Sequence, residues 1–156
     1  MTAQFIADVL LAAMTPLIAL IAVCIAYQQH KINQSHLRHE LYERRLRVYK
    51  AVQGFLSEIL RDGNVPWHRT SQFYADASEA VFLFDSSIQK HIDLLYEKAI
   101  DLHTLHEKMY PSDGSHGLPV GEERSKAAQQ KGELLKWLTH QLSETKQLFR
   151  KHMGIE

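Results

Sequence analysis

A run of nineteen residues near the N-terminus, Val9 to Tyr27, contains no charged side chain (VLLAAMTPLIALIAVCIAY). As a helix with about 1.5 Å of rise per residue, this run is roughly 28 Å long, close to the ~30 Å hydrocarbon core of a bilayer. The sequence therefore predicts one membrane-spanning helix over residues 9–27, preceded by a short segment of residues 1–8. The other inferences about this chain depend on that helix.

Two other interpretations of the apolar run are less favoured. A secretory signal peptide begins with positive charge, whereas the first eight residues, MTAQFIAD, contain Asp8 and neither Lys nor Arg. A buried helix of a soluble core seldom continues for nineteen residues without a polar face. We therefore expect the helix to be retained and to cross the membrane.

The distribution of basic residues predicts the orientation of this helix. Six Lys or Arg residues follow the run before Gly54, against two Glu residues, and none precedes it. These residues are Lys31, Arg38, Arg44, Arg45, Arg47 and Lys50. Because basic flanks stay on the inner side, we expect the N-terminus outside and residues 28–156 in the cytoplasm. Tyr27, Lys31 and Arg38 would then lie at the inner junction with the bilayer.

Arg44, Arg45 and Arg47 lie farther along the chain. On a straight helix at about 1.5 Å per residue they are more than ~20 Å from the bilayer, where salt screens attraction to anionic lipid. We therefore interpret these three residues as candidate contacts with a protein partner. The alternative interpretation is a solvated basic surface.

Small side chains recur along one face of the predicted span. This seam consists of Ala12, Thr15, Ala19, Ala22 and Ala26. Small residues allow two membrane helices to approach closely, so the seam predicts association of the span with another helix. The alternative is that alanine is simply frequent in membrane helices.

Composition excludes some classes of protein. The formal net charge of the 156 residues is zero, so no overall positive field attracts nucleic acid. The single cysteine, Cys24, cannot form an internal disulfide, which suits a reducing compartment. The 129 residues after the span are enough for one domain with a core of its own. We therefore expect a short external segment (1–8), a transmembrane helix (9–27) and a helical cytoplasmic domain (28–156).

Helical periodicity continues through that domain. Apolar residues recur at spacings of three and four in four segments: residues 28–61, 70–83, 88–109 and 122–152. The residues expected on inner faces are Leu37, Leu41, Val48, Val52, Phe55, Ile59, Phe73, Ala77, Ala80, Val81, Ile88, Ile92, Leu95, Ala99, Leu102, His106, Met109, Ala128, Leu135, Leu138, Leu142, Thr145 and Phe149. The pattern predicts an all-α fold, in which the membrane helix continues into an up-and-down bundle of three long helices and one short helix.

Capping and turn residues predict where these helices begin and end. Asp62, Gly63 and Pro66 favour an end to the first helix. Thr70 or Ser71 is expected to cap the short helix, and the DSS sequence at residues 85–87 the next. The segment YPSDGSHGLPVG, residues 110–121, is the clearest loop.

The sequence His-x-x-His-Glu occurs twice, as HLRHE at residues 36–40 and HTLHE at residues 103–107. Two histidines three residues apart lie on one helical face, so His103 and His106, with Glu107, are weak candidates for a metal site. The order differs from the HExxH pattern of zinc proteases, and ten scattered histidines make such spacings frequent. We therefore expect no catalytic residue, cofactor, metal or small-molecule substrate, and interpret His106 as a hydrogen-bonded core residue.

Two segments of the chain resemble those of other proteins. With its apolar run, the segment ELYERRLRVYKAV at residues 40–52 and the segment EAVFLF at residues 79–84, the chain is similar to a loose group of uncharacterised bacterial proteins with one N-terminal membrane helix. The resemblance implies a bacterial inner membrane and a helical cytoplasmic body. It implies no reaction and no site residue.

These features favour a non-enzymatic, single-pass inner-membrane protein. Its cytoplasmic bundle would act as an interaction scaffold, or a subunit of a membrane-associated complex, that binds another protein or a second copy. One alternative is a small membrane effector, of the toxin or phage-defence type, that oligomerises and permeabilises the bilayer. A second alternative is a histidine-dependent metal-binding or pH-sensing protein.

Overall fold

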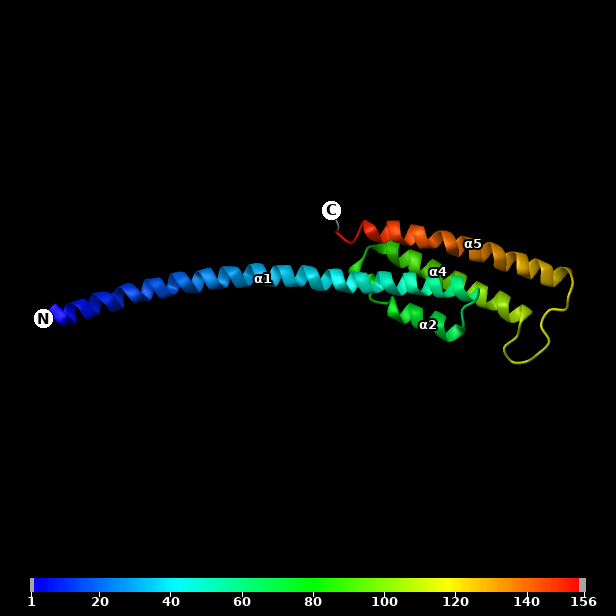
Figure 1. Cartoon of the computed structure of the whole chain (residues 1–156), viewed down its shortest axis with the longest axis horizontal. Helices are drawn as coiled ribbons and strands as arrows, with labels where there is room; N and C mark the ends of the chain where they lie inside the picture. The colour runs from blue at the N-terminus through cyan, green and yellow to red at the C-terminus, as the bar shows by residue number, and fades with distance from the viewer. Residues whose placement is uncertain (1, 155–156) are drawn as a thin grey trace. The chain divides into compact units, whose positions relative to one another are not determined.

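The computed structural model describes the backbone of residues 2–154 and the side chains of residues 18–34 and 36–154. These residues form helices and loops and contain no strand (Figure 1). The helices are α1 (Thr2–Asp62), α2 (Trp67–Asp76), α3 (Ala80–Leu83), α4 (Ser86–Met109) and α5 (Glu122–Arg150). The expectation of an all-α fold is therefore confirmed for the part of the chain that is described.

The chain divides into two compact units, Met1–Leu41 and Tyr42–Glu156. The first unit consists of the N-terminal part of α1, and its described side chains are exposed. The predicted inward positions of Leu37 and Leu41 are therefore wrong, since these side chains are 60% and 48% exposed. Among the described residues, no helix has a segment both long enough and apolar enough to span a bilayer. The side chains of residues 9–17, half of the predicted span, lie outside the description.

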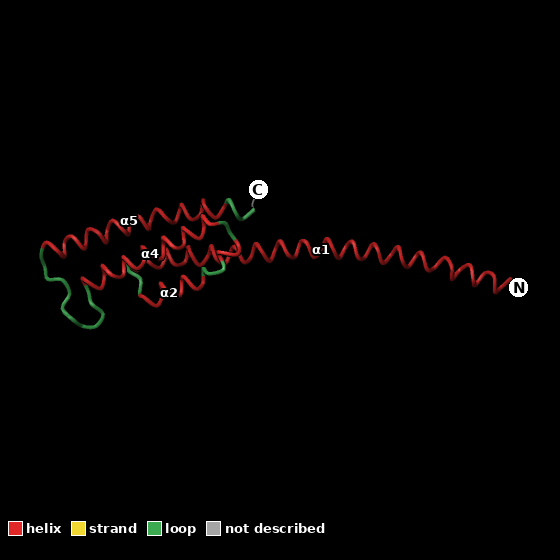
Figure 2. Tube along the Cα trace, turned by 180° about the vertical axis from the view of Figure 1, so that it is seen from behind, coloured by secondary structure: helices red, strands yellow, loops and turns green. Residues whose placement is uncertain are grey.

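The second unit is a helical bundle. Within it, the C-terminal part of α1 and α4 run in one direction, whereas α2 and α5 run in the other (Figures 1 and 2). Helix α4 packs against α2, α3 and α5. The predicted up-and-down order of the bundle is thus present, with α2 as the short helix.

Apolar side chains from all of these helices form one core. Its members at most 1% exposed include Val52, Leu56, Ile59, Val65, Ala77, Ala80, Ile88, Ile92, Leu95, Ala99, Leu102, Leu138 and Phe149. Fully burying one such large apolar side chain contributes about 1.5–3 kcal/mol. Phe55 of α1 stacks on Phe73 of α2, with 4.0 Å between ring centroids. These contacts fix α1 in the bundle from Val48 to Ile59.

The short helix differs from the expectation of one helix over residues 70–83. The chain forms α2, which ends at Asp76 with Ala77 as its C-cap, and a separate four-residue helix, α3. Helix α2 begins directly after Pro66, a residue that suits a helix start. Thr70 is therefore inside the helix and buried rather than at its cap. Val81 is 55% exposed, so its predicted inward position is wrong.

Helices α4 and α5 follow their predicted segments closely. The predicted cap of α4 is confirmed, since the Asp85 carboxylate accepts from the Ser87 N–H at 2.9 Å. In α5, Ala127 is buried and Ala128 is exposed, which corrects the predicted face. At about 3.6 residues per turn, 18 residues make five full turns, so Ala127 lies on the same face of α5 as Thr145, whereas Ala128 lies about 100° away from it.

Candidate functional site

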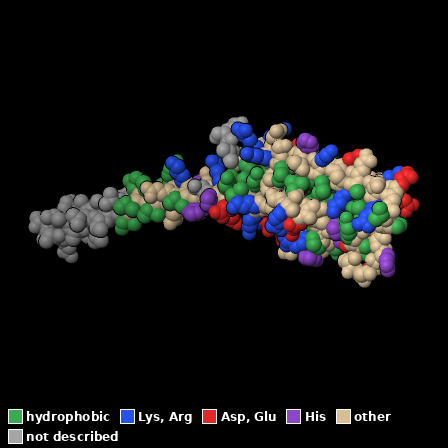
Figure 3. Space-filling view, turned by 45° about the vertical axis from the view of Figure 1, so that its right-hand side comes forward, with side chains coloured by type: hydrophobic (Ala, Val, Ile, Leu, Met, Phe, Trp, Pro, Cys, Tyr) green, Lys and Arg blue, Asp and Glu red, His purple; other side chains and the backbone are tan. Residues whose placement is uncertain are grey.

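Large apolar side chains are exposed along the described part of the predicted span. Ile18, Leu20, Ile21, Val23, Ile25 and Tyr27 are each between 49% and 71% exposed. No charged residue lies among them. Figure 3 shows hydrophobic side chains gathered over this part of α1. Contiguous exposed apolar surfaces are typical of regions that contact a membrane or another protein.

The residues predicted at the junction and the seam lie in the same unit. Lys31 and Arg38 are exposed, as is Tyr27, and Cys24 is a free, exposed thiol. Three seam residues, Ala19, Ala22 and Ala26, are exposed. The other two, Ala12 and Thr15, lie outside the described side chains. Association through this seam stays a prediction.

The three arginines predicted to face a partner have different surroundings. Arg44 and Arg47 are exposed, whereas Arg45 is half-buried. The Arg45 guanidinium donates to the Leu83 carbonyl at 3.1 Å and to the His152 carbonyl at 2.8 Å. It also lies over the Phe84 ring, 5.7 Å from the centroid. Arg45 thus links α1 to the ends of α3 and α5 within the chain.

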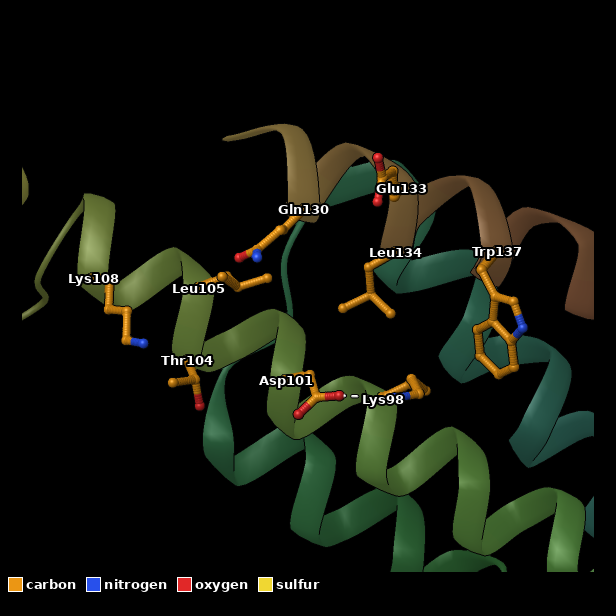
Figure 4. A pocket seen from close by; sticks show the side chains of 9 residues that line it. All are labelled: Lys98, Asp101, Thr104, Leu105, Lys108, Gln130, Glu133, Leu134 and Trp137. Carbon is orange, nitrogen blue, oxygen red and sulfur yellow. Dashed lines mark hydrogen bonds and ion pairs between the residues drawn. The ribbon is translucent and has the colours of Figure 1, made fainter. Parts of the chain in front are cut away.

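A groove of about 530 Å³ lies between α4 and α5. We call it the α4–α5 groove; it is lined by Lys98, Asp101, Thr104, Leu105, Lys108, Gln130, Glu133, Leu134 and Trp137. Leu105 and Leu134 point toward each other across the groove, and the Trp137 ring lies at one end (Figure 4). Lys98 and Asp101 pair at 2.9 Å. Apolar side chains with a charged rim of both signs are typical of surfaces that bind proteins.

A second groove, of about 250 Å³, lies between the bundle part of α1 and the end of α5. We call it the α1–α5 groove; it is lined by Tyr42, Leu46, Tyr49, Lys146, Phe149, Arg150 and Met153. No acidic residue lines it. This groove is therefore apolar with a basic rim.

The residues singled out as metal candidates, His103, His106 and Glu107, have different surroundings. Nδ1 of His106 is 2.9 Å from the Lys131 ammonium nitrogen, and the Glu107 carboxylate accepts from the N–H and hydroxyl of Ser112. Nδ1 of His103 is buried with no hydrogen-bond partner. Over the described residues, no three His, Cys, Asp or Glu side chains are placed to hold a metal ion.

Burial lowers the pKa of both groups in the contact between His106 and Lys131. Burial lowers the pKa of His106, and the nearby Lys131 charge lowers it further. Burial also lowers the pKa of the Lys131 amine. The imidazole is therefore favoured in its neutral form, which accepts the Lys131 proton at Nδ1. His106 is hydrogen-bonded and half-buried, close to its expected role.

Comparison with known protein families, with curated protein sequences and with solved structures finds no match. The candidate surfaces are therefore judged from geometry alone. Sequence reasoning missed both grooves, because each combines residues from two helices that are distant in the chain. Trp137 and Tyr49, each directly next to a lysine in the sequence, are the aromatic residues that could have indicated them.

Proposed function

We propose that this chain is a non-enzymatic, single-pass membrane protein that holds a companion protein at the cytoplasmic face of a bacterial inner membrane. One observation carries the proposal. The described half of the uncharged run exposes six large apolar side chains, whereas the second unit has a core of its own. In water this exposure is costly, since each such side chain gains about 1.5–3 kcal/mol when it is buried.

The orientation in this proposal rests on the basic residues after the run. Lys31 and Arg38 are exposed and follow Tyr27 closely. A basic flank stays in the cytoplasm, which puts the second unit there. Its surface offers the companion protein two grooves in which apolar and aromatic side chains are bordered by charge.

Affinity purification from native membranes tests this function. The full chain, with a C-terminal tag, is extracted in mild detergent and compared with a variant in which Leu105 and Trp137 of the α4–α5 groove are replaced by Ala. We expect a specific companion protein in constant ratio to the full chain, and less of it with the variant. A strictly monomeric chain without a companion would count against the proposal.

Membrane potential separates this function from that of a membrane effector. A scaffold leaves the potential unchanged when the full chain is overproduced, whereas an oligomerising effector that permeabilises the bilayer depolarises the cells. A potential-sensitive dye reports the difference. Depolarisation that follows the level of the full chain would contradict the scaffold.

A further inference from the structure

The short helix α3 presents the most exposed aromatic side chain of the described bundle. Phe82 is 88% exposed and its neighbour Val81 is 55% exposed, while Ala80 beside them is fully buried in the core. Glu79, one turn before Phe82, is exposed and lines a cleft with Asp76 and Arg47. We call Glu79, Val81 and Phe82 the α3 patch. It combines a protruding apolar group with negative charge.

The α1–α5 groove has the complementary character. Its apolar wall is fixed by the core, because the Tyr49 and Phe149 rings are in contact with centroids 5.5 Å apart, and Phe149 is 1% exposed. Arg45 holds the chain after α5 by donating to the His152 carbonyl, next to Met153 of the groove. The groove is therefore shaped before any partner binds, which lowers the entropic cost of binding.

The rim of this groove is basic and lacks an acidic counterpart. Lys146 and Arg150 are four residues apart on α5, so they lie on the same helical face. Both are exposed, and neither makes an ion pair within the described residues. Two neighbouring cations repel each other, and an acidic group of a partner would relieve this repulsion.

These observations assign an occupant to the groove. We infer that Phe82 of one copy of the chain inserts into the α1–α5 groove of a second copy, with Glu79 near Lys146 and Arg150. At about 250 Å³ the groove is smaller than the usual pocket for a drug-sized ligand (~300–1,000 Å³), which favours a side chain as its occupant. Tyr, Phe, Met and Arg, which line the groove, are enriched in protein interfaces.

This pairing goes beyond the proposed function, since it needs no companion protein. Each copy carries both the α3 patch and the groove, so a two-fold arrangement would use the contact twice. The surfaces belong to the second unit and are distinct from the small-residue seam of the predicted span. The experiment must therefore distinguish pairing through the α3 patch and the α1–α5 groove from association of two chains through the predicted span.

Site-specific disulfide formation between two versions of the full chain tests the pairing in native membranes. Both versions carry Cys24→Ser; one also carries Val81→Cys, at an exposed position next to the intact Phe82, and the other Leu46→Cys, with different tags. After mild oxidation we expect a disulfide-linked species that contains both tags. As a control, Lys136→Cys replaces Leu46→Cys, because Lys136 is exposed on α5 and lies outside both grooves.

Charge exchange supplies a second test that needs no change to the core. Lys146→Glu with Arg150→Glu in the Leu46→Cys version should lower the disulfide yield about three- to tenfold, the range expected from two exposed ion pairs. Adding Asp76→Lys with Glu79→Lys to the Val81→Cys version should restore the yield. The matched reversal Lys90→Glu with Lys136→Glu should leave it unchanged, since both lysines are exposed and away from this groove.

Three results would overturn the pairing. The first is an equal yield with the Lys136→Cys control, which would indicate random collision or association through the membrane span alone. The second is the absence of a mixed disulfide while the companion protein still co-purifies, which would leave the proposed function intact. The third is a yield that does not respond to the charge exchange.

Discussion

At the scale of single residues, a buried polar contact links α4 to α5. Nε2 of His91 is 2.7 Å from the hydroxyl oxygen of Thr145, which is fully buried. Burial lowers the pKa of His91, and the nearby Glu144 carboxylate only partly opposes this. The folded bundle therefore holds a neutral imidazole that the unfolded chain would protonate near pH 6.5.

The sign of the resulting pH dependence follows from proton binding. Below the ordinary histidine pKa the unfolded chain binds more protons than the folded chain, so the free energy of unfolding falls as the pH falls. We expect the urea midpoint of the full chain in detergent to decrease from about pH 7 to about pH 5. Fluorescence of Trp67 and Trp137, both in the second unit, measures it.

Replacing the histidine isolates its share of this pH dependence. His91→Gln removes the titrating group, so the decrease in the urea midpoint should be smaller. His68→Gln, at an exposed position, serves as the control and should behave like the natural chain. An unchanged pH dependence in His91→Gln would show that His91 does not contribute, and would leave His106, whose pKa is also lowered by burial, as the other source.

Two basic residues make contacts between helices that could not be predicted from the sequence. Arg44, Arg45 and Arg47 are equivalent as members of a basic run, and only the fold distinguishes Arg45, whose two carbonyl partners come from residues 83 and 152. The same holds for Lys131, which meets His106 from 25 residues away. Spacing along a helix reports neighbours on that helix, whereas contacts between helices depend on packing.

At the scale of elements, the loop between α4 and α5 depends on one close approach of the backbone. A Cβ at Gly117 would collide with the Met109 carbonyl and with the Pro111 ring. The adjacent Leu118 N–H donates to the Lys108 carbonyl at 3.0 Å and holds the loop against the end of α4. Only glycine fits at residue 117 without displacing this contact.

Two glycine substitutions should therefore change stability in opposite directions. Gly117→Ala should lower the free energy of unfolding by about 1–3 kcal/mol, the usual cost of overpacking. Gly132→Ala should raise it by about 0.5–1 kcal/mol, because Gly132 lies within α5 with no atom close to a new Cβ, and Ala favours the helix. Urea unfolding of both variants, followed by tryptophan fluorescence, gives the two values. Equal signs would contradict this account of the loop.

The helices were predictable from the sequence where apolar residues recur at helical spacing over a long segment and where the capping residues are distinct. The three long helices and the loop of residues 110–121 agree with the pattern, and α4 begins at the predicted cap. The break between α2 and α3 was missed because residues 77–79, Ala-Ser-Glu, contain neither Gly nor Pro. Ala77 and Ala80, on either side of Ser78 and Glu79, are both buried in the core, a tertiary contact that local propensity does not include.

At the scale of the whole molecule, two units differ in what covers their apolar side chains. In Tyr42–Glu156 the bundle helices bury a common core, whereas between Ile18 and Tyr27 the large apolar side chains are exposed. A bilayer around residues 9–27 would cover the second set and would leave the bundle free to bind proteins. We propose that residues 9–27 lie in a membrane, and this claim is independent of the groove and patch contacts, which concern the bundle alone.

Alkaline carbonate extraction of membranes is the most direct measurement of that claim. It compares the full chain with a chain of residues 42–156, which lacks the apolar run but retains the core and both tryptophans. The account predicts that the full chain stays in the membrane pellet and is released only by detergent, while residues 42–156 stay in the supernatant. Release of the full chain by carbonate without detergent would contradict the account.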